Sequence, residues 1–438
     1  MIKPTAQQSN KPACLRDDAL AVLMRLRENG HIAYFAGGCV RDELLGLTPK
    51  DYDIATDAPP DRVRKLFTNT QAVGAAFGVI LVRQRKSVVE VATFRTDGTY
   101  IDGRRPEAVM FTTAEEDAKR RDFTINGLFL DPIENRVIDY VGGQEDLQNR
   151  VLRAIGDADH RFEEDHLRML RAVRFAARFE LTVDPSTENA IIRHAEQLKR
   201  ISPERIADEL RMMLGEPSRI RAWPMLWRLR MIDVIFRHLP SQNEEPLAPQ
   251  RSILRVLSPE EPLEFGEVLA AAILCYRWQR TARGDIRQFL GRRAAVEAAN
   301  AMRQALRISN DEVDQLREIL ESLESLLGDP PPTIAMKKRF LARRYHPAAM
   351  EVLEAIGEIG LLTDRIGPLY AELYQLYEAD VAPPPLITGD DLTDAGLMPG
   401  PKFKIALDRT YDAQLEGRIT TRQEAIEMAI RIASGEPG

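Results

Sequence analysis

Cysteine is scarce in this sequence, and so are long apolar runs. The 438 residues include three cysteines, Cys14, Cys39 and Cys275, with no C-x-x-C spacing. This excludes a disulfide framework and a cysteine-rich zinc site. Residues 1–18 contain no apolar core of signal-peptide length, and no later segment approaches a membrane span. The sequence therefore predicts a cytoplasmic protein with no membrane segment.

Excess positive charge is also missing from the chain as a whole. The net charge is −7, which by itself argues against a nucleic-acid partner. The average hides a difference along the chain, because residues 151–240 carry 16 basic and 14 acidic residues and form its one net-positive segment. We expect any contact with a polyanion there or on the neighbouring segments.

The pattern of apolar residues changes near residue 150. Before it, short β-type runs alternate with helical segments, which predicts a mixed sheet with covering helices. After it, the spacing is almost entirely helical, with proline-rich breaks near residues 240–249, 328–333 and 379–391. The pattern predicts the α+β class. The expected domains are residues 1–150, 151–220, 221–380 and 381–438.

Two acidic residues in the stretch KDYDIAT stand one residue apart, at Asp51 and Asp53. In an extended strand they would point to the same side and repel each other. Taken alone, such a pair is best explained as an exposed strand end with turn-forming aspartates. The surrounding segments decide whether it is more than that.

Those segments favour a site for phosphate and a cation. Gly37 and Gly38 end an apolar strand and open a helix, where free backbone N–H groups can hold phosphate. Arg41, one turn into that helix, could add a charged donor. Glu90 lies within the apolar strand VVEVATF, where an unpaired carboxylate would be costly to bury. A divalent cation shared with the two aspartates would compensate all three acids.

The chemistry that fits these residues is two-metal phosphoryl transfer. Mg²⁺ prefers oxygen ligands and is commonly held by one or two carboxylates together with substrate phosphates. Two such ions about 4 Å apart can activate an attacking hydroxyl and stabilise a leaving pyrophosphate. A nucleoside triphosphate would be the donor. The sequence contains no G-K-[ST], so a Walker-type site is excluded.

Seven motifs, in order, resemble those of the class II tRNA nucleotidyltransferase and bacterial poly(A) polymerase family. They lie between about residues 31 and 215 and read GGCVRDELLG, DYDIAT, VEVATFRTDGTYIDGRRPEAVMF, EEDAKRRDFTINGLFLD, DYVGG, EEDHLRMLRAVRFAARF and SPERIADEL. Residues 386–425 also resemble the C-terminal tail of CCA-adding members. The resemblance implies a polymerase-β-like nucleotidyltransferase head at 1–150, a helical neck for nucleotide selection at 151–220, and a helical body and tail that bind tRNA.

Carried over position by position, the resemblance implies a role for each motif residue. Asp51 and Asp53 would be the metal ligands, and Glu90 the third carboxylate. Gly38 and Arg41 would contact the triphosphate, and Arg121 and Asp122 the nucleotide and its sugar. The complete nucleotide-binding set would be Gly37, Gly38, Arg41, Arg121, Asp122, Asn126, Asp165, Arg168, Arg171 and Arg174. Gly127 stands where relatives usually have alanine, and we expect this departure to be tolerated.

The charged row in EEDHLRMLRAVRF predicts how the base is selected. Asp165 and Arg168 are three residues apart and would share a helix face, with Arg171 and Arg174 continuing the row. Alone, such a row is more simply explained as a solvated face. A carboxylate and a guanidinium together can read an exocyclic amine beside a ring nitrogen, a pattern that cytosine and adenine share. The pair would then accept CTP and ATP and reject UTP and GTP, without a nucleic-acid template. His166 would point elsewhere and pack.

The favoured function is therefore the Mg²⁺-dependent addition of CCA to the 3′ end of tRNA from CTP and ATP, with release of pyrophosphate. Poly(A) polymerase shares the catalytic motifs, but such enzymes tend to carry a basic pair where this chain has Ala75 and Ala76. CC-adding relatives lack a loop like residues 95–109, so its presence favours A addition, and an A-only enzyme stays open.

Two further questions are whether the chain is catalytic at all and whether its helical body holds a second metal site. A non-catalytic RNA-binding scaffold is disfavoured, because clustered unpaired acids would be a liability without a metal. Cys275 and Tyr276 occupy positions where some relatives carry a metal-binding His-Asp pair. We therefore expect no second metal site in the helical body.

Overall fold

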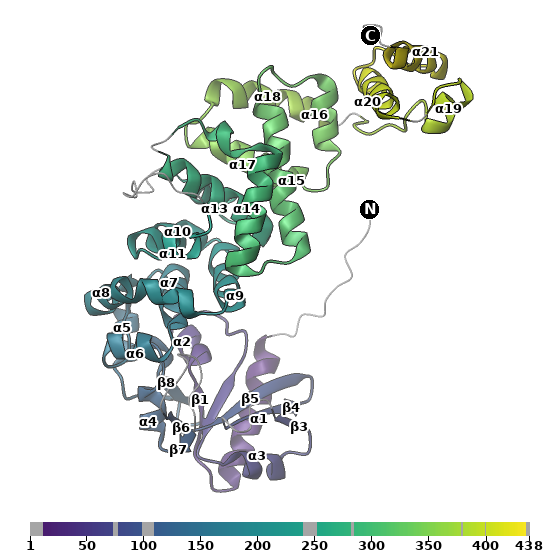
Figure 1. Cartoon of the computed structure of the whole chain (residues 1–438). Coiled ribbons are helices and arrows are strands. Elements are labelled where there is room, and N and C mark those ends of the chain that lie inside the picture. Colours follow the sequence, from purple (N-terminus) through teal and green to yellow (C-terminus); the bar gives the residue numbers. More distant parts are fainter. Residues whose placement is uncertain are drawn as a thin grey trace. The chain divides into compact units, whose positions relative to one another are not determined.

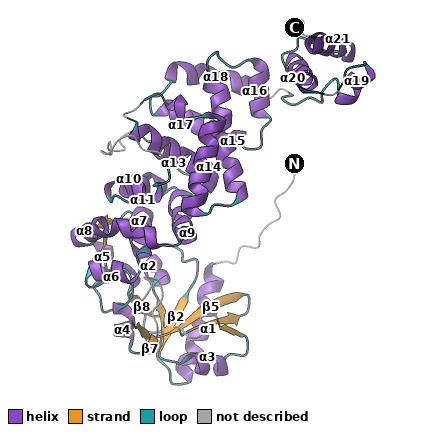
Figure 2. Cartoon of the chain, in the orientation of Figure 1, coloured by secondary structure: helices purple, strands orange, loops and turns teal. Residues whose placement is uncertain are grey.

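The computed structural model describes residues 12–72, 78–98, 109–239, 252–281, 284–377, 380–398 and 400–434. The chain divides into two compact units (Figure 1). The first comprises Met1–Glu209 and Arg228–Ile235, and the second Leu210–Trp227 and Phe236–Gly438. All described strands, orange in Figure 2, belong to the first unit, and the second is helical. The predicted α+β class, a mixed sheet followed by helices, is confirmed.

A seven-stranded mixed sheet forms the centre of the first unit, in the order β3-β4-β5-β2-β1-β8-β9. Strands β2 and β5 run parallel, and the other neighbouring pairs are antiparallel. The strands are β1 (Ala33–Ala36), β2 (Asp53–Thr56), β3 (Thr70–Ala72), β4 (Val79–Gln84), β5 (Ser87–Thr93), β8 (Leu128–Asp131) and β9 (Arg136–Asp139). A separate hairpin pairs β6 (Arg95–Asp97) with β7 (Val109–Phe111).

Helices cover both faces of the sheet because side chains alternate along each strand. Helix α1 (Pro12–Glu28) packs on β1, β4 and β5, and α3 (Pro60–Leu66) packs on β4 and β5. On the other face, Phe94 and Phe129 pack edge to face at 5.9 Å beside α4 (Ala114–Lys119). Helix α2 (Gly38–Leu44) follows β1 directly, as the two-glycine junction predicts.

The DYVGG segment holds a short turn against the sheet. The Asp139 carboxylate accepts hydrogen bonds from the four backbone N–H groups of residues 141–144, at 2.9–3.1 Å, and so caps α5 (Gly143–Gln148). Although burial alone would raise the pKa of Asp139, these bonds lower it. Gly143 lies against the 3-10 turn η2 (Thr124–Asn126): a Cβ there would be 2.2 Å from the Thr124 carbonyl oxygen.

Gly127 directly follows η2, and neighbouring side chains occupy the space that a side chain at this position would need. A Cβ at this position would lie 2.7 Å from Val141 Cγ2 and 3.2 Å from Ile155 Cδ1. The side chains of Val141 and Ile155 therefore occupy the space that an alanine methyl would need. The close packing of these two side chains accompanies the glycine at a position where relatives usually have alanine.

Helices follow the sheet in the remainder of the first unit. They are α6 (Ala158–Glu164), α7 (Leu167–Phe179), α8 (Pro185–His194), the 3-10 helix η3 (Ala195–Arg200), α9 (Pro203–Leu214), which continues into the second unit, and α11 (Ile232–Ile235). The short strands β10 (Val151–Leu152) and β11 (Thr182–Val183) pair in parallel beside them.

The prediction that Asp165 and Arg168 share one helix is wrong. Helix α6 ends at Glu164, and Asp165 is extended, with φ −146° and ψ 104°. Its carboxylate accepts the N–H of Leu167 at 3.0 Å, at the start of α7. An aspartate side chain that bonds the backbone ahead of it competes with helix hydrogen bonds, and this local bond accompanies the break.

The second unit is built around α13 (Phe265–Arg280), all of whose residues are buried. The helices before it are α10 (Arg219–Arg228) and α12 (Ile253–Val256). The elements that follow are η4 (Ile286–Phe289), α14 (Gly291–Leu306), α15 (Asn310–Leu327), α16 (Ile334–Leu341), α17 (His346–Glu358) and α18 (Thr363–Tyr377). Trp223 and Trp227 are buried. The last three helices, α19 (Gly389–Asp394), α20 (Pro401–Leu415) and α21 (Arg422–Ser434), enclose a hydrophobic cluster of their own.

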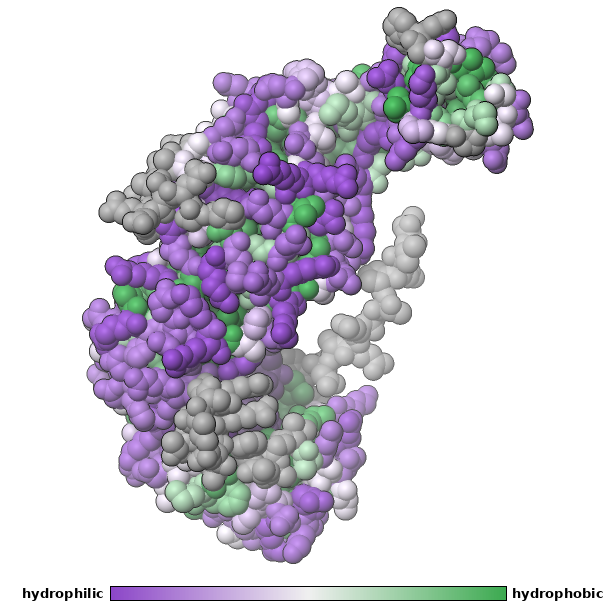
Figure 3. All heavy atoms as spheres, in the orientation of Figure 1, coloured by the Kyte–Doolittle hydropathy of each residue, from purple (hydrophilic) through white to green (hydrophobic). Residues whose placement is uncertain are grey.

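The visible surface is mainly hydrophilic, with apolar residues scattered over it (Figure 3). Within the described residues, no helix combines the length and the apolarity needed to cross a membrane.

The contact between Gly143 and Thr124 generates a test of the fold. We expect Gly143→Ala to lower the free energy of unfolding by about 1–3 kcal/mol, because the new methyl group must displace backbone rather than a flexible side chain. Denaturant-induced unfolding measures the effect. Gly367→Ala is the matched control: Gly367 lies in α18 with open space around it, so alanine should stabilise the helix by up to about 1 kcal/mol. A Gly143→Ala protein as stable as the unmodified chain would contradict the tight contact.

Candidate active site

Three carboxylates lie at one end of the central strands. The parallel register pairs Ile54 of β2 with Val91 of β5, which places Asp53 and Glu90, one residue earlier on each strand, on the same face of the sheet. Burial raises the pKa of Asp53 to about 7, and the negative charges of Glu90 and Asp51 contribute. An acid with this pKa is poorly compensated by the protein around it.

Two expectations about these acids are corrected. Asp51 precedes β2, which begins at Asp53, so the pair does not stand on one strand as expected. Glu90 is exposed, whereas its strand neighbours Val89 and Val91 are buried, because the alternation of the strand turns Glu90 to the opposite face. The cost of burial is therefore smaller than expected. The surrounding protein and the charge of Asp51 nevertheless raise the pKa of Glu90.

The donor set matches the requirements of a hard cation only in part. Across the ranges that the structure describes, no group of three or more histidine, cysteine, aspartate and glutamate side chains is arranged to hold a metal ion. An ion at Asp53 would therefore complete its shell with water and substrate oxygens. Mg²⁺ is commonly bound in this way, by one or two carboxylates. Burial and nearby acids raise the pKa of Asp53, so a bound cation would stabilise the charged form of this carboxylate.

The two-glycine junction leaves room for an anion. Gly37 has φ +69°, a conformation that residues with a side chain rarely adopt, and a Cβ there would lie 2.8 Å from Arg121 Nη1. A Cβ on Gly38 would lie 3.6 Å from Arg41 Nη2. Both positions line the cavity described below. The contact at Gly38 is an ordinary one, whereas the glycine at position 37 allows the Arg121 guanidinium to approach the backbone at the start of α2.

Arg41 is buried and held on three sides. Its Nε and Nη2 donate to Asp42 Oδ1 at 2.9 and 2.6 Å, and its Nη1 donates to Asn126 Oδ1 at 2.6 Å. The guanidinium carbon lies 4.3 Å from the centroid of the Phe179 ring. Because a guanidinium has five N–H donors, these bonds leave others for a ligand while fixing the plane of the group.

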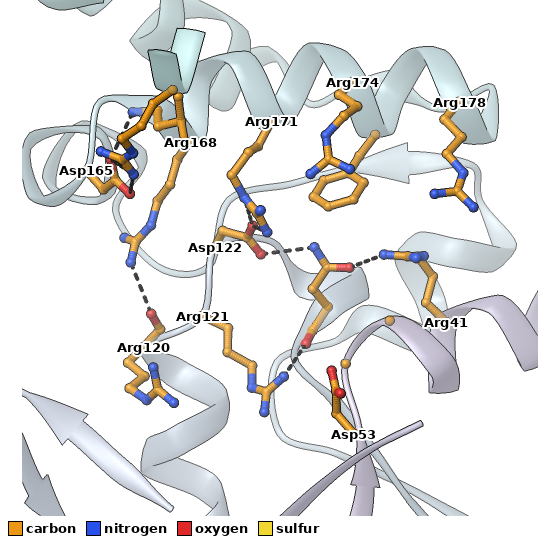
Figure 4. Close-up of a pocket in the computed structure, with 16 residues that line it drawn as sticks. Arg41, Asp53, Arg120, Arg121, Asp122, Asp165, Arg168, Arg171, Arg174 and Arg178 are labelled. Atoms are coloured by element: carbon orange, nitrogen blue, oxygen red, sulfur yellow. Dashed lines mark hydrogen bonds and ion pairs between the residues drawn. The ribbon is translucent and has the colours of Figure 1, made fainter. Parts of the chain in front are cut away.

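Asp122, which lies between α4 and η2, is bonded to α7. Arg171 donates to Asp122 Oδ2 through Nε and Nη2, at 2.8 and 2.7 Å. Asn126 Nδ2 donates to Asp122 Oδ1 at 3.0 Å, so the Asn126 amide bridges Asp122 and Arg41 (Figure 4). Although burial alone would raise it, the charge of Arg171 and the hydrogen bonds from Asn126 and Arg171 lower the pKa of Asp122 to about 2. The carboxylate is therefore ionised under ordinary conditions.

The predicted base-reading residues line the same cavity but are bound to other partners. Asp165 accepts from Arg205 Nη2 at 2.9 Å, and Arg168 Nη1 donates to Glu164 Oε2 at 2.5 Å. Because the helix breaks at Asp165, this residue does not share a helix face with Arg168, which corrects the expectation from spacing. Arg168, Arg171 and Arg174 do follow one another along α7, as expected. His166 is buried, with Nδ1 2.7 Å from the Phe162 carbonyl oxygen.

These residues surround a cavity of about 490 Å³. The lining consists of Gly37, Gly38, Arg41, Asp53, Arg120, Arg121, Asp122, Asn126, Asp165, Leu167, Arg168, Arg171, Arg174, Phe175, Arg178 and Arg205. Most of the predicted site is brought together there, whereas Asp51 and Glu90 lie outside the lining. Eight arginines against three aspartates give the lining of the cavity an excess of positive charge. Such a cavity suits a ligand with several negative charges.

Sequence reasoning missed three of the arginines, Arg120, Arg178 and Arg205. Arg178 continues the α7 row one turn beyond Arg174, so the spacing could have found it. Arg205 comes from α9 and reaches the cavity only through the fold. Arg120 donates to Asp117 Oδ1 through Nε and Nη2, at 3.0 and 2.7 Å. No pattern in the sequence separates it from Arg121, its neighbour.

Comparison with known proteins places the chain among nucleotide-adding enzymes. The Poly A polymerase head domain model matches residues 33–153, and a model described as a probable RNA and SrmB-binding site of polymerase A matches residues 180–243. The CCA-adding enzyme of Geobacillus stearothermophilus is 34% identical over 415 residues, which cover 93% of this chain and 95% of that protein. The CCA-adding enzyme of Bacillus subtilis is 47% identical over 203 residues, 46% of this chain and 51% of that protein.

A solved structure is similar over almost the full length. The crystal structure of the Bacillus stearothermophilus CCA-adding enzyme in complex with CTP has a TM-score of 0.71 and 28% sequence identity. The similarity covers 97% of this chain and 98% of that one. The mixed sheet and the helices that follow it are thus shared with that enzyme.

The ion pair between Asp122 and Arg171 generates a pH-dependent prediction. We expect Asp122→Asn to lower the free energy of unfolding by about 3 kcal/mol at pH 7, because Arg171 loses its carboxylate. The pKa of Asp122 is depressed in the folded chain, so its contribution is complete above the unfolded pKa of about 3.9 and is lost as the pH falls through about 2.

Denaturant-induced unfolding between pH 7 and pH 3 measures the difference in the free energy of unfolding between the unmodified chain and Asp122→Asn. It should stay constant down to about pH 5 and fall by about half at pH 3. Asp61→Asn, in the exposed first turn of α3, is the matched control and should change stability by less than about 0.5 kcal/mol. Equal free energies of unfolding at pH 7, or a difference that does not shrink at pH 3, would contradict a stabilising ion pair between Asp122 and Arg171.

Proposed function

We infer the reaction from one premise: the chain belongs to the family of CCA-adding enzymes. It is a tRNA nucleotidyltransferase that adds CCA to the 3′ end of tRNA from CTP and ATP, with release of pyrophosphate, and it needs no nucleic-acid template. The observation that carries this conclusion is one cavity in which a poorly compensated aspartate, Asp53, lies among eight arginines. That cavity can hold a triphosphate and a cation together.

Enzymes of this family generally depend on a divalent metal ion. We propose that the ion is Mg²⁺ and that Asp51 and Asp53 hold it, with Glu90 beside them. When bound, Mg²⁺ supplies positive charge that activates the attacking 3′-hydroxyl and stabilises the leaving pyrophosphate. Two of these acids have raised pKa values, so a cation in their midst relieves their mutual repulsion.

The chain's own residues position the nucleotide. We propose that Gly37, Gly38 and Arg41 bind the triphosphate, with the Arg41 plane fixed by Asp42 and Asn126. Arg121 and Asp122 bind the nucleotide and its sugar, Asn126 and Arg171 hold Asp122 in place, and Arg174 completes the nucleotide-binding set. Asn126 has both ends of its amide engaged, by Arg41 and Asp122, so its part is to orient them.

Asp165 and Arg168 are proposed to read the base. A carboxylate has about four acceptor positions and a guanidinium five donors, so the bonds to Arg205 and Glu164 leave capacity on both groups. Asp165 can accept from the exocyclic amine that cytosine and adenine share, and Arg168 can donate to the adjacent ring nitrogen. Uracil and guanine present a carbonyl and a ring N–H there, which would leave buried groups unpaired.

The relatives favour full CCA addition over the alternatives. They are named CCA-adding enzymes over nearly the whole length of this chain, which supports that reading above poly(A) synthesis and above partial CC or A addition. Ala75, Ala76 and residues 99–108 of the expected flexible loop lie outside the described residues. We also propose the roles of the domains: a catalytic head at 1–150, a nucleotide-selecting neck at 151–220, and a body at 221–380 and a tail at 381–438 that bind tRNA. The proposed location of the protein is the cytoplasm.

A primer extension assay tests the function. The chain is incubated with Mg²⁺, with CTP and ATP together, one of them labelled, and with tRNA transcripts that end before CCA, before CA and before A. We expect three, two and one nucleotides to be added. The control is Asp53→Ala, which should abolish incorporation while tRNA binding persists, because a phosphate-transfer site without its metal ligand cannot act. Long A tails on unrelated RNA, only one type of nucleotide added, or turnover by Asp53→Ala would each contradict the proposal.

A further inference from the structure

One arginine on α7 differs from the others in its partners. Arg168 pairs with Glu164, Arg171 with Asp122, and Arg174 with Glu209. Among the residues that the structure describes, the Arg178 side chain forms no ion pair and no hydrogen bond. The contact that it does make is with the ring of Phe179, whose centroid lies 4.9 Å from the guanidinium carbon. Its charge is therefore not compensated within the described chain.

The surroundings of Arg178 contain a second cation. Arg178 lines the cavity together with Arg41, and its side chain is exposed. Burial lowers the pKa of Arg41, Asp42 opposes that effect, and the positive charge of Arg178 lowers the pKa further. The two guanidinium groups are thus close enough to repel each other. An anion between them would turn this repulsion into attraction on both sides.

The order of the arginines along α7 indicates which part of a nucleotide would reach Arg178. Arg168 stands beside Asp165, at the end of the cavity proposed to read the base, and Arg178 stands at the other end, near Arg41 (Figure 4). Ten residues of α-helix span about 15 Å, which is comparable with the length of an extended nucleoside triphosphate. A nucleotide whose base meets Asp165 would therefore extend its phosphates toward Arg41 and Arg178.

We propose that Arg178 binds the two outer phosphates of the incoming nucleotide, those released as pyrophosphate, beside Arg41. This inference rests on the proposed function of the cavity. In-line displacement brings the attacking hydroxyl to the α-phosphate from the side opposite the leaving group, so the RNA end lies away from these phosphates. Arg178 is accordingly a ligand of the nucleotide and of the product, and it has no part in choosing the base.

Direct titration of the full chain with pyrophosphate, in Mg²⁺ and without RNA, tests the proposal by calorimetry. We expect Arg178→Ala to weaken pyrophosphate binding about tenfold, the scale of one charge-assisted hydrogen bond. The pyrophosphate affinity of Arg178→Lys should lie between those of the unmodified chain and Arg178→Ala, because a lysine keeps the charge but loses the planar guanidinium. The matched control is Arg136→Ala: Arg136 is 65% exposed, pairs with Glu134, and does not line the cavity. It should bind pyrophosphate as the unmodified chain does.

Steady-state assays give the second readout. Arg178→Ala should raise the KM for CTP and for ATP by a similar factor, while discrimination against UTP and the affinity for tRNA stay unchanged. Unaltered pyrophosphate binding overturns the proposal, as does a loss of tRNA affinity in its place, which would assign Arg178 to RNA. If the unmodified chain adds no CCA, the proposed function fails, and the pyrophosphate titration still decides the role of Arg178.

Discussion

The compensation of many guanidinium groups by few carboxylates is the constraint on which this structure depends. Eight arginines line one cavity with three aspartates, and most are held by carboxylates from several segments. Asp122 shows how this works. It accepts from Arg171 on α7 and from Asn126 on η2, and Asn126 in turn accepts from Arg41 on α2. One chain of bonds thus connects Arg171, in the middle of the α7 row, with Arg41 at the proposed phosphate end of the cavity.

Two aspartates of the cavity differ in pKa because their neighbours differ. Arg171 and Asn126 lower the pKa of Asp122 to about 2 against the effect of burial, so this residue is a fixed anion. Burial and two nearby acids raise the pKa of Asp53 to about 7. The first acid is satisfied by the protein, whereas the second is suited to an external cation. Groups whose environments move their pKa values apart commonly have separate functions at one site.

The sequence was sufficient for the features that depend on local pattern. The alternation of β1, β2 and β5, the glycine junction before α2 and the arginine row of α7 all follow from the spacing of residues. The break at Asp165 could not be predicted in this way, because periodicity does not include a side chain that bonds the backbone. Strand alternation places Glu90 on the face opposite Val89 and Val91, although the apolar run around it suggests burial. Arg205 depends on the packing of α9, which no motif contains.

Selection of the nucleotide by the protein itself is the central claim. It is tested most directly by the affinities of CTP, ATP, UTP and GTP for the chain without RNA. Binding by Asp165 and Arg168 predicts that CTP and ATP bind at least about tenfold more tightly than UTP and GTP, since a mismatch leaves buried polar groups unpaired. It also predicts that Asp165→Ala reduces the difference. Equal affinities for all four nucleotides would contradict selection by these residues.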